Sequence, residues 1–539
     1  MTLRRPTPIV REALLAAFAA ASLAALLLWA GPPGNDLAAH VYQRALFLKH
    51  GFVLWNNFWY AGRYSFVTYS LLYYPLSALL GIKVLALASI CAAAVAFAIV
   101  IGREWGPATR WSSRTFAVLW AGTVLSAAFP FALGFALGLL ALSSLQAGRR
   151  FAFAALAVLA LAASPLAFLF LALVLVGVAI ARRPTRDGLI VPGAVILAGV
   201  ALQLVLKRLF PGSGHFPFHA GQLVPAVLFC TLGALMTRAH QRARPLLGLF
   251  IAYLVACVVF FAVPLDLGSN VERLRYAAIP LALLAVTVVG WRPVAIALPL
   301  LAVAAVWNVQ PLIANYRHAA EDPAAKPQYW QPAISFLDHY STPSYRVEVV
   351  DTVGHWPAAY FPEANIPIVR GWYRQNDFPA NEILYDQGVG SEAYRAWLRS
   401  LGVRYVVLAA APPDYSSRAE AALLRGGSSG LAPVFHNARL TIYELPRAAP
   451  VVSGPSPAEV RAMSETKLFI RVGGPGRYRV AVRFSPYWRA THGCVSRASD
   501  GMTTLTARRA ETIVLSFSVN MHRSLEALTG ARPEPFCRR

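Results

Sequence analysis

Acidic residues are scarce in the first 310 positions of this 539-residue chain. Of the 25 aspartates and glutamates in the sequence, 19 come later, and the six that remain are Glu12, Asp36, Glu104, Asp187, Asp266 and Glu272. The whole chain is 57% hydrophobic and only 14% charged. This composition excludes an ordinary soluble domain and is typical of a multi-pass membrane protein.

Several common catalytic and binding motifs are also missing. The sequence has no Walker-type phosphate loop, no dinucleotide-binding glycine pattern in a fitting context, no zinc-protease helix motif and no nucleophile elbow. Their absence argues against an ATP-driven pump and a soluble-type hydrolase. The net charge of +24 lies mostly in short loops between apolar segments. No basic stripe interleaved with aromatic residues indicates a nucleic-acid partner.

Cysteine is rare, with five residues in the chain. Cys91, Cys230 and Cys257 fall in apolar stretches, where we expect them to pack. Cys494 and Cys537 lie in the C-terminal third and could pair in an oxidising compartment. The sequence leaves this pairing open.

Apolar segments follow one another through residues 1–310 and predict about 11 membrane spans. Several are shorter than the ~20 residues that cross a ~30 Å hydrocarbon core, so their boundaries are approximate. We expect the first to be a retained signal anchor. The segments are 13–30, 82–101, 115–129, 131–147, 151–163, 166–181, 189–206, 222–237, 246–263, 276–290 and 294–310.

Arginines in the loops predict the orientation. If the N-terminus is cytoplasmic, every loop on that side is basic, as the positive-inside rule expects. The exterior side then receives residues 31–81, 207–221, 264–275 and everything after 310. Arginine outnumbers lysine 44 to 5, a bias typical of a high-GC bacterial genome. We therefore expect a protein of the bacterial plasma membrane with an exterior C-terminal region.

Asp36 stands directly after the first apolar run. An acid at the mouth of a membrane helix costs free energy unless it faces water or a partner. Asp36 is therefore the candidate catalytic base of a polar site at the membrane surface. His40 comes four residues later and shares its face if a helix begins there. A helix N-cap is the alternative role for Asp36.

The stretch 51–76 is dense in aromatic residues and contains Trp55, Asn56, Arg63 and Tyr64. An interfacial aromatic belt would explain this composition. A cleft for a lipid-linked sugar is the second interpretation. In that cleft, aromatic faces and amides would meet the sugar, and the Arg63 guanidinium would meet phosphate.

The order of these residues resembles a known family. The matching pattern is an apolar helix, Asp36, His40, Gly51, Trp55, Gly62-Arg63-Tyr64 and Tyr73-Tyr74-Pro75-Leu76. It is similar to the first periplasmic loop of GT-C-fold glycosyltransferases. It looks closer still to bacterial membrane proteins described as 6-pyruvoyl-tetrahydropterin-synthase-related. Residues 485–490 with Asp500-Gly501 resemble the C-terminal β-domain of YfhO-type GT-C proteins.

The resemblance implies a GT-C-like membrane domain of about 11 spans and a polyprenyl-phosphate-linked sugar donor. It also implies that Asp36 acts as base or metal ligand. Many GT-C enzymes have a second acid where this chain has Asn35. The sequence therefore gives no support for a divalent metal, although the resemblance is compatible with one, and no cofactor is assigned.

The loop 265–276 breaks the trend of basic residues inside. It places Arg273 and Arg275, with Asn270, at the start of an apolar segment on the exterior side. Either arginine could bind the donor phosphate. Local pairing with Asp266 and Glu272 is the equal alternative. His215 and His219 lie in another exterior loop and are expected to line the cleft rather than to hold a metal.

Residues 311–447 predict an exterior α/β domain, and residues 459–539 predict a β-sandwich-like domain, with a linker rich in Pro, Ser and Gly between them. The expected strands include 345–350, 402–408, 441–445, 467–472, 478–484, 502–506 and 512–519, and a helix is expected over 392–401. Trp356, Tyr373 and Trp488 are expected in the core, with sugar stacking as the alternative.

These observations predict a membrane glycosyltransferase for hexosyl or pentosyl transfer. It would move a sugar from a polyprenyl-phosphate donor to an envelope glycan, lipid or protein acceptor. Asp36 would act as base with help from His40, and Arg63 with Arg273 or Arg275 would bind the leaving phosphate. The alternative is a non-enzymatic membrane protein that binds or translocates a lipid-linked glycan.

Overall fold

The computed structural model describes residues 7–182, 185–212, 214–386, 388–529 and 536–538. The chain divides into two compact units, each assembled from separated stretches. The first unit contains Met1–Leu37, Tyr69–Gln203 and His215–Ala320. The second contains Ala38–Thr68, Leu204–Gly214 and Glu321–Arg539. The sequence predicted domain boundaries at 310, 447 and 459, and these stay predictions. The two units divide the chain in a different way, because part of the first loop belongs with the C-terminal residues.

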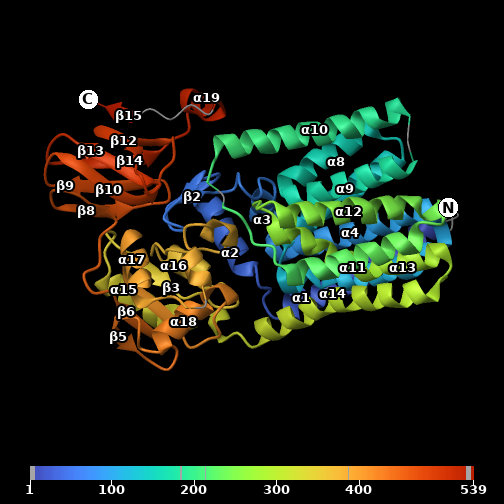
Figure 1. Ribbon diagram of the computed structural model, residues 1–539, viewed down its shortest axis with the longest axis horizontal. Helices are drawn as coiled ribbons and strands as arrows, with labels where there is room; N and C mark the ends of the chain where they lie inside the picture. The colour runs from blue at the N-terminus through green and yellow to red at the C-terminus, as the bar shows by residue number, and fades with distance from the viewer. Residues whose placement is uncertain (1–6, 183–184, 213, 387, 530–535, 539) are drawn as a thin grey trace, which may run out of the picture. The chain divides into compact units, whose positions relative to one another are not determined.

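The first unit is a helical bundle whose long helices lie side by side with nearly aligned axes (Figure 1). The predicted apolar segments overlap its helices, although the segment 115–129 is spread over three of these helices. The helices are α1 (Pro8–Ala30), α3 (Tyr73–Leu80), α4 (Ile82–Trp105), α5 (Arg110–Ala121), α6 (Thr123–Ser126), α7 (Phe129–Gln146), α8 (Arg150–Ala163), α9 (Pro165–Arg182), α10 (Arg186–Leu209), α11 (Ala220–Thr237), α12 (Arg244–Ala262), α13 (Ala278–Val289) and α14 (Val294–Ala320).

Among the described residues, eight helices or continuous helical runs are long and apolar enough to cross a membrane. The α4–α6 run, Ile82–Ser126, counts as one of them, and α8 is a shorter apolar helix. The chain is therefore a multi-pass membrane protein. In α10 only 6% of the most apolar window is buried, against 56% in α7, so α10 presents its apolar side chains outward. That surface suits contact with lipid.

Small residues allow a close helix contact in the bundle. A Cβ added to Gly248 of α12 would lie 2.0 Å from the carbonyl oxygen of Gly177 in α9. A Cβ on Gly177 would lie 2.7 Å from the backbone of Gly248. Only glycine fits at such a crossing, as in small-residue contacts between membrane helices generally.

The α/β part of the second unit is built on a four-stranded sheet of order β3-β4-β6-β5. Strand β3 runs parallel to β4, and the other pairs are antiparallel. Buried Val and Leu side chains of β4 pack against the amphipathic helix α17. The elements are α15 (Pro327–Tyr340), β3 (Arg346–Val349), α16 (Pro357–Glu363), α17 (Ser391–Ser400), β4 (Val403–Ala409), α18 (Arg418–Arg425), β5 (Ala432–His436) and β6 (Leu440–Glu444).

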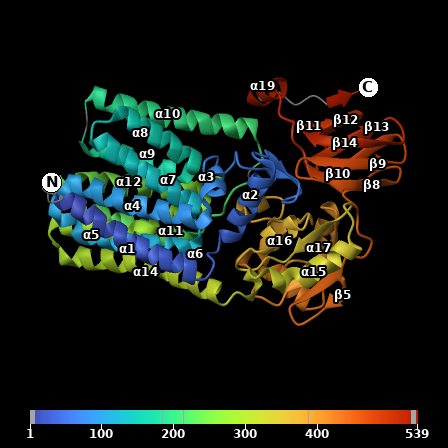
Figure 2. The ribbon, with the colours of Figure 1, turned by 180° about the vertical axis from the view of Figure 1, so that it is seen from behind.

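The C-terminal part is a β-sandwich whose two sheets share one apolar core (Figure 2). The sheet orders are β15-β12-β13-β10-β7 and β11-β14-β9-β8. Cys494 of β12 and Cys537 of β15 form a disulfide, which resolves the pairing that the sequence left open. The strands are β7 (Val452–Ser453), β8 (Ala458–Met463), β9 (Lys467–Val472), β10 (Gly476–Arg483), β11 (Trp488–Ala490), β12 (Gly493–Arg497), β13 (Met502–Ala507), β14 (Glu511–Phe517) and β15 (Phe536–Arg538), and α19 (Met521–Thr529) precedes β15.

The first loop also contributes to the core of the sandwich. After α2 (Leu37–His50), a short hairpin of β1 (Trp55–Asn56) and β2 (Arg63–Tyr64) places Trp55 and Tyr64 in that core. The predicted strands and the helix near 392–401 are confirmed. Trp356, Tyr373 and Trp488 are all buried, as expected for core residues.

The glycine contact between α9 and α12 predicts a sharp difference between two substitutions. Gly248→Ala must push the helices apart and should lower stability by about 1–3 kcal/mol, the usual cost of overpacking. Gly193→Ala in α10 is the matched control, because its Cβ would meet nothing within 4 Å. Thermal unfolding of the purified full chain measures both, and equal melting temperatures would contradict the packing described.

Candidate functional site

Asp36 is held by a tight approach between two turns of the first unit. The backbone N–H of Asn35 donates to Leu125 O and that of Asp36 donates to Ser126 O, at 3.3 and 3.1 Å. A Cβ on Gly34 would lie 2.3 Å from the carbonyl oxygen of Val124. Glycine at position 34 therefore permits the approach that fixes the acid.

The Asp36 carboxylate faces Arg273. Its Oδ2 lies 3.7 Å from Arg273 Nη2, and both side chains are largely buried. Burial disfavours the charged form of Arg273, but Tyr69 and Asp36 outweigh that effect and raise its pKa above the usual value. The Arg273 guanidinium also lies 5.6 Å from the centre of the Phe131 ring. The arrangement keeps a fixed cation beside the candidate base.

The other residues of the 265–276 loop are engaged locally. Arg275 Nη1 lies 3.6 Å from Glu272 Oε2, which is the local pairing considered for it. The loop forms a 3₁₀ segment, Gly268–Ala277, in which the Asn270 backbone N–H donates to Leu267 O at 2.9 Å. Of the two arginines, Arg273 is the one that meets Asp36.

Asp36 and His40 belong to different units, Asp36 to the first and His40 to the second. Helix α2 begins at Leu37, so Asp36 directly precedes it, at the place of an N-cap. The His40 side chain is fully buried, with its ring centre 6.0 Å from that of Trp372. His219 stands at the N-terminus of α11, where its backbone N–H donates to Gln222 Oε1 at 3.1 Å, and its place on the rim of a cleft stays a prediction.

Trp55, Asn56 and Tyr64 are buried and have partners in the second unit. Trp55 stacks on Phe517 with ring centres 5.2 Å apart. Asn56 donates to the hydroxyl of Tyr42 at 3.1 Å and accepts from the N–H of Phe58 at 2.9 Å. The Tyr64 hydroxyl lies 2.9 Å from Ser485 Oγ.

Arg63 lies over the face of Tyr373, with its guanidinium carbon 3.6 Å from the ring centre. Its Nη2 donates to Thr68 Oγ1 at 3.1 Å. Its Nε and Nη1 are buried and have no hydrogen-bond acceptor among the described residues. The side chain is thus held in place while two of its donor groups stay unused.

Trp55, Arg63 and Tyr64 line a cavity of about 580 Å³ in the second unit. Residues between positions 207 and 212, Gly214, Asn376, residues 378–380 and parts of the sandwich and of α19 complete its wall. The segments come close together at Gly214, where a Cβ would lie 1.9 Å from Phe378 O. The cavity therefore brings together four stretches that are far apart in the sequence.

A network of buried charges holds the loop beneath Arg63. Arg370 donates to both carboxylate oxygens of Asp377, at 3.2 and 2.8 Å. Asp377 also accepts from Asn381 at 3.0 Å and from Tyr385 at 2.7 Å. Burial alone would raise the pKa of Asp377, but the guanidinium groups of Arg370 and Arg374 lower it. Asp377 therefore stays ionised at neutral pH.

Asp351, His355 and Asp414 form the group of described side chains that could hold a metal, with donor atoms within 4.8 Å of one another. Arg374 already lies in this group. Its Nη2 contacts Asp351 and lies 2.9 Å from His355 Nδ1, and its Nε lies 3.6 Å from Asp414 Oδ2. The guanidinium supplies a positive charge where a cation would sit.

Two further acids, Glu348 and Glu420, are fully buried near the same network. The Tyr394 hydroxyl donates to Glu420 Oε1 at 2.7 Å. Burial raises the pKa of Glu348 and raises that of Glu420 to about 7. Burial therefore favours protonation of Glu348 at neutral pH, whereas Glu420 titrates near neutral pH.

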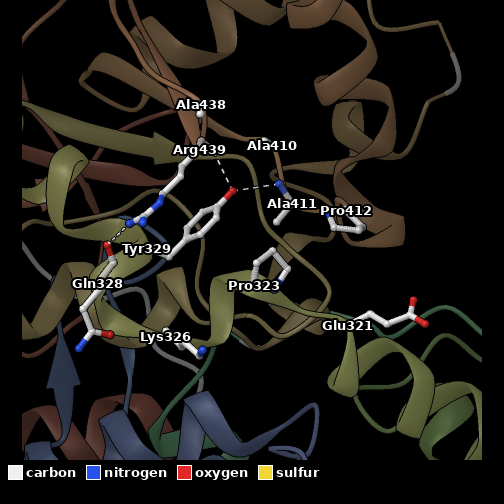
Figure 3. Close-up of a pocket in the computed structure, with 10 residues that line it drawn as sticks. All are labelled: Glu321, Pro323, Lys326, Gln328, Tyr329, Ala410, Ala411, Pro412, Ala438 and Arg439. Carbon is white, nitrogen blue, oxygen red and sulfur yellow. Dashed lines mark hydrogen bonds between the residues drawn. The ribbon is translucent and has the colours of Figure 1, made fainter.

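A second cavity, of about 590 Å³, lies beside α15 (Figure 3). The Tyr329 hydroxyl donates to Arg439 O at 2.7 Å and accepts from the Ala411 N–H at 3.0 Å. Arg439 Nη1 donates to Gln328 O at 2.8 Å. Figure 3 shows these polar groups directed at the backbone that they brace, which indicates a structural role.

Neither Arg370 nor Asp377 was predicted from the sequence as a functional residue. Both lie in irregular segments without periodicity, so no pattern marked them. The one available signal was the density of charged residues between positions 346 and 377, in a region otherwise predicted as a folded core.

No protein-family model matches the sequence, and no curated protein matches it. Among solved structures, the fold is similar to arabinofuranosyltransferase AftD from Mycobacteria, with 18% identity over 90% of this chain and a TM-score of 0.48. A variant of AftD shows 20% identity over 83% of this chain with a TM-score of 0.48. The chain spans 42% of the length of AftD.

ArnT from Cupriavidus metallidurans, in a structure bound to undecaprenyl phosphate, is also similar. It shows 14% identity, covers 83% of this chain and 98% of its own, and gives a TM-score of 0.34. These similarities are distant. The function proposed for this chain therefore rests on its own residues. The closer kinship to the pterin-synthase-related and YfhO-type proteins stays a prediction.

Glu420→Gln is expected to remove a pH dependence of stability. The folded-state pKa of about 7 lies above the ordinary value of 4.5, so the folded protein binds the extra proton between these limits. Wild-type stability should therefore be fully present below pH ~4.5 and fall by about 3 kcal/mol as pH rises through 7.

Thermal unfolding of the purified full chain between pH 5 and 8 measures this effect. The Glu420→Gln profile should be flatter than that of wild type. Glu392→Gln changes an exposed acid on α17 and should keep the wild-type profile. Parallel profiles for all three proteins would contradict a buried, proton-binding Glu420.

Proposed function

We propose that this chain is a membrane glycosyltransferase that uses a polyprenyl-phosphate-linked sugar as donor. The acceptor would be a cell-envelope glycan, lipid or protein on the exterior face of a bacterial plasma membrane. The observation that carries the proposal is the pair formed by Asp36 and Arg273, 3.7 Å apart at the end of the first apolar helix. A base beside a fixed cation supplies both charges that such a transfer needs.

The chemistry would be an inverting transfer. The Asp36 carboxylate takes the proton of the acceptor hydroxyl as its oxygen forms a bond to the anomeric carbon. The bond from that carbon to the donor phosphate breaks, and the phosphate leaves with the electron pair. Arg273 stabilises the negative charge that develops on it. One base and one cation are sufficient for this step.

The Asp36–Arg273 pair would also couple donor binding to basicity. A cation next to a carboxylate lowers its affinity for protons. A donor phosphate that engages Arg273 would compete for the guanidinium, and Asp36 would become a stronger base. The carboxylate would thus be activated when the donor is in place.

The remaining predicted residues keep supporting roles in this proposal. The help that His40 would give to the base stays a prediction, and Arg275 with Asn270 would shape the loop that carries Arg273. Trp55, Asn56 and Tyr64 would hold in place the polar residues that line the cavity of the second unit. Arg63 keeps the anion-binding role predicted for it, at the cavity of that unit.

Asp36→Asn and Asp36→Ser are expected to abolish transfer. Both side chains can cap a helix, so they preserve the structural role that would otherwise explain Asp36. Neither can act as a base, and the loss of a general base costs about 10²–10⁴-fold in rate. Mass spectrometry of envelope glycans in the native host should show the same missing sugar in both variants as in a deletion strain.

Asp187→Asn is the control, because Asp187 is an exposed acid at the start of α10. It should leave the glycans unchanged, and all proteins should be present in the membrane in equal amounts. If the deletion loses a sugar but both Asp36 variants retain it, Asp36 only caps α2. The binding or translocation of a lipid-linked glycan would then be the better account.

A further inference from the structure

We propose that the cavity behind hairpin β1–β2 binds an anionic saccharide, one that carries a carboxylate or phosphate group, as part of the acceptor. Its volume of about 580 Å³ falls within the ~300–1,000 Å³ of ligand sites. The role of this saccharide as acceptor rests on the transferase function proposed above, whereas its binding in the cavity does not. The inference is carried by the charges of the cavity wall.

Basic side chains dominate this wall. Among the residues that the structure describes, it contains Arg63, Lys207, Arg208, Arg483 and Arg497, but only two acids, Asp500 and Glu526. Charges of one sign that line a concave surface concentrate the electric field in it and attract a ligand of the opposite sign.

Both acids of the wall are neutralised by cations outside it. Asp500 Oδ2 lies 2.7 Å from Arg479 Nε, and Glu526 Oε2 lies 2.8 Å from Arg523 Nη1. By contrast, Arg63, Arg483 and Arg497 form no ion pair with a carboxylate in the described part of the chain. The charge of these three arginines is therefore left for a ligand.

Arg63 is prepared to bind an anion. It is only 5% exposed, and its ring partner Tyr373 and its hydrogen bond to Thr68 fix the plane of the guanidinium. Its Nε and Nη1 have no acceptor among the residues described. A planar guanidinium with unused donors matches the paired oxygens of a carboxylate or phosphate.

The rest of the wall suits a saccharide better than a lipid chain. Asn376 contributes an amide, and Gly212 and Gly501 expose backbone at positive φ, where a side chain would be strained. Phe378 and Phe484 add aromatic surface. Polar groups with a few aromatic rings fit the hydroxyls and C–H faces of sugars, whereas a polyprenyl chain requires a continuous apolar channel.

The test is direct binding to the full chain in lipid nanodiscs, measured by isothermal titration. The probes are cellobiouronic acid and glucose 6-phosphate, with neutral cellobiose as the reference. The anionic probes should bind at least about tenfold more tightly than cellobiose, and their affinity should fall as salt is added. Arg497→Gln should weaken their binding by about tenfold, because it removes one exposed cation of the wall.

Arg477→Gln is the matched control, since Arg477 is an exposed arginine of the same sheet that lies outside the cavity wall. It should bind as wild type does. Equal binding of anionic and neutral probes, or equal loss in both arginine variants, would overturn the inference. The inference would also be overturned if Arg497→Gln weakened the binding of undecaprenyl phosphate in the disc but of neither soluble anion. The ligand would then be a lipid headgroup.

Asp36→Asn separates this inference from the transferase proposal. The variant should bind the anionic probes as wild type does while it transfers no sugar. If the probes bind but Asp36→Asn retains activity, the transferase mechanism fails and the anion site stands. If transfer depends on Asp36 but no anionic probe binds, the reverse holds.

Discussion

The buried ion pair of Arg370 and Asp377 is the interaction on which the cavity of the second unit depends. Neither side chain is more than 3% exposed, and each has further hydrogen-bond partners. Breaking a buried pair leaves an uncompensated charge at a cost of about 3–5 kcal/mol, so the segment that contains both residues has one stable arrangement. That segment carries Tyr373 under Arg63 and the wall residues 376–380. The Arg370–Asp377 pair does not line the cavity itself. It fixes in place the residues that would contact a ligand there.

In the membrane unit, too, a pair of opposite charges fixes the site, although charged residues are fewer there. Where acids are so scarce, the pairing of Asp36 with Arg273 is itself informative, since each charge would be costly alone in an apolar bundle. Backbone contact does the positioning, because Gly34 lets the turn before Asp36 lie against Val124. Asn35 adds a hydrogen bond to Asn315 of α14 at 3.1 Å. The acid is therefore fixed from its backbone, and its carboxylate lies beside the guanidinium of Arg273.

The sequence predicted the parts of the fold that follow from local pattern. Apolar runs of membrane length marked the helices, and alternation marked strands such as β9, whose predicted and observed bounds agree. Strands β5 and β8 were not predicted, because their side chains are mostly exposed or only partly buried. The association of 38–68 and 204–214 with the C-terminal residues was beyond local pattern. It depends on contacts such as Tyr64 with Ser485, which are 421 positions apart.

The candidate sites show the same division. Asp36 and Arg273 were each conspicuous in the sequence as a charge in an unexpected place, but their partnership came only with the fold. Arg63 was conspicuous too, and the structure adds what a sequence cannot supply, namely its unused donors. Leaving buried donors unsatisfied costs about 1–3 kcal/mol, and natural sequences tolerate such local costs mainly at functional sites. The stacking of Arg63 on Tyr373 and the hydrogen bond to Thr68 offset part of that cost while holding the guanidinium still. Arg63 is fixed and buried, and it forms no ion pair with a carboxylate in the described part of the chain. In a wall whose described acids are already neutralised, this arrangement is better explained by an absent anion than by stability.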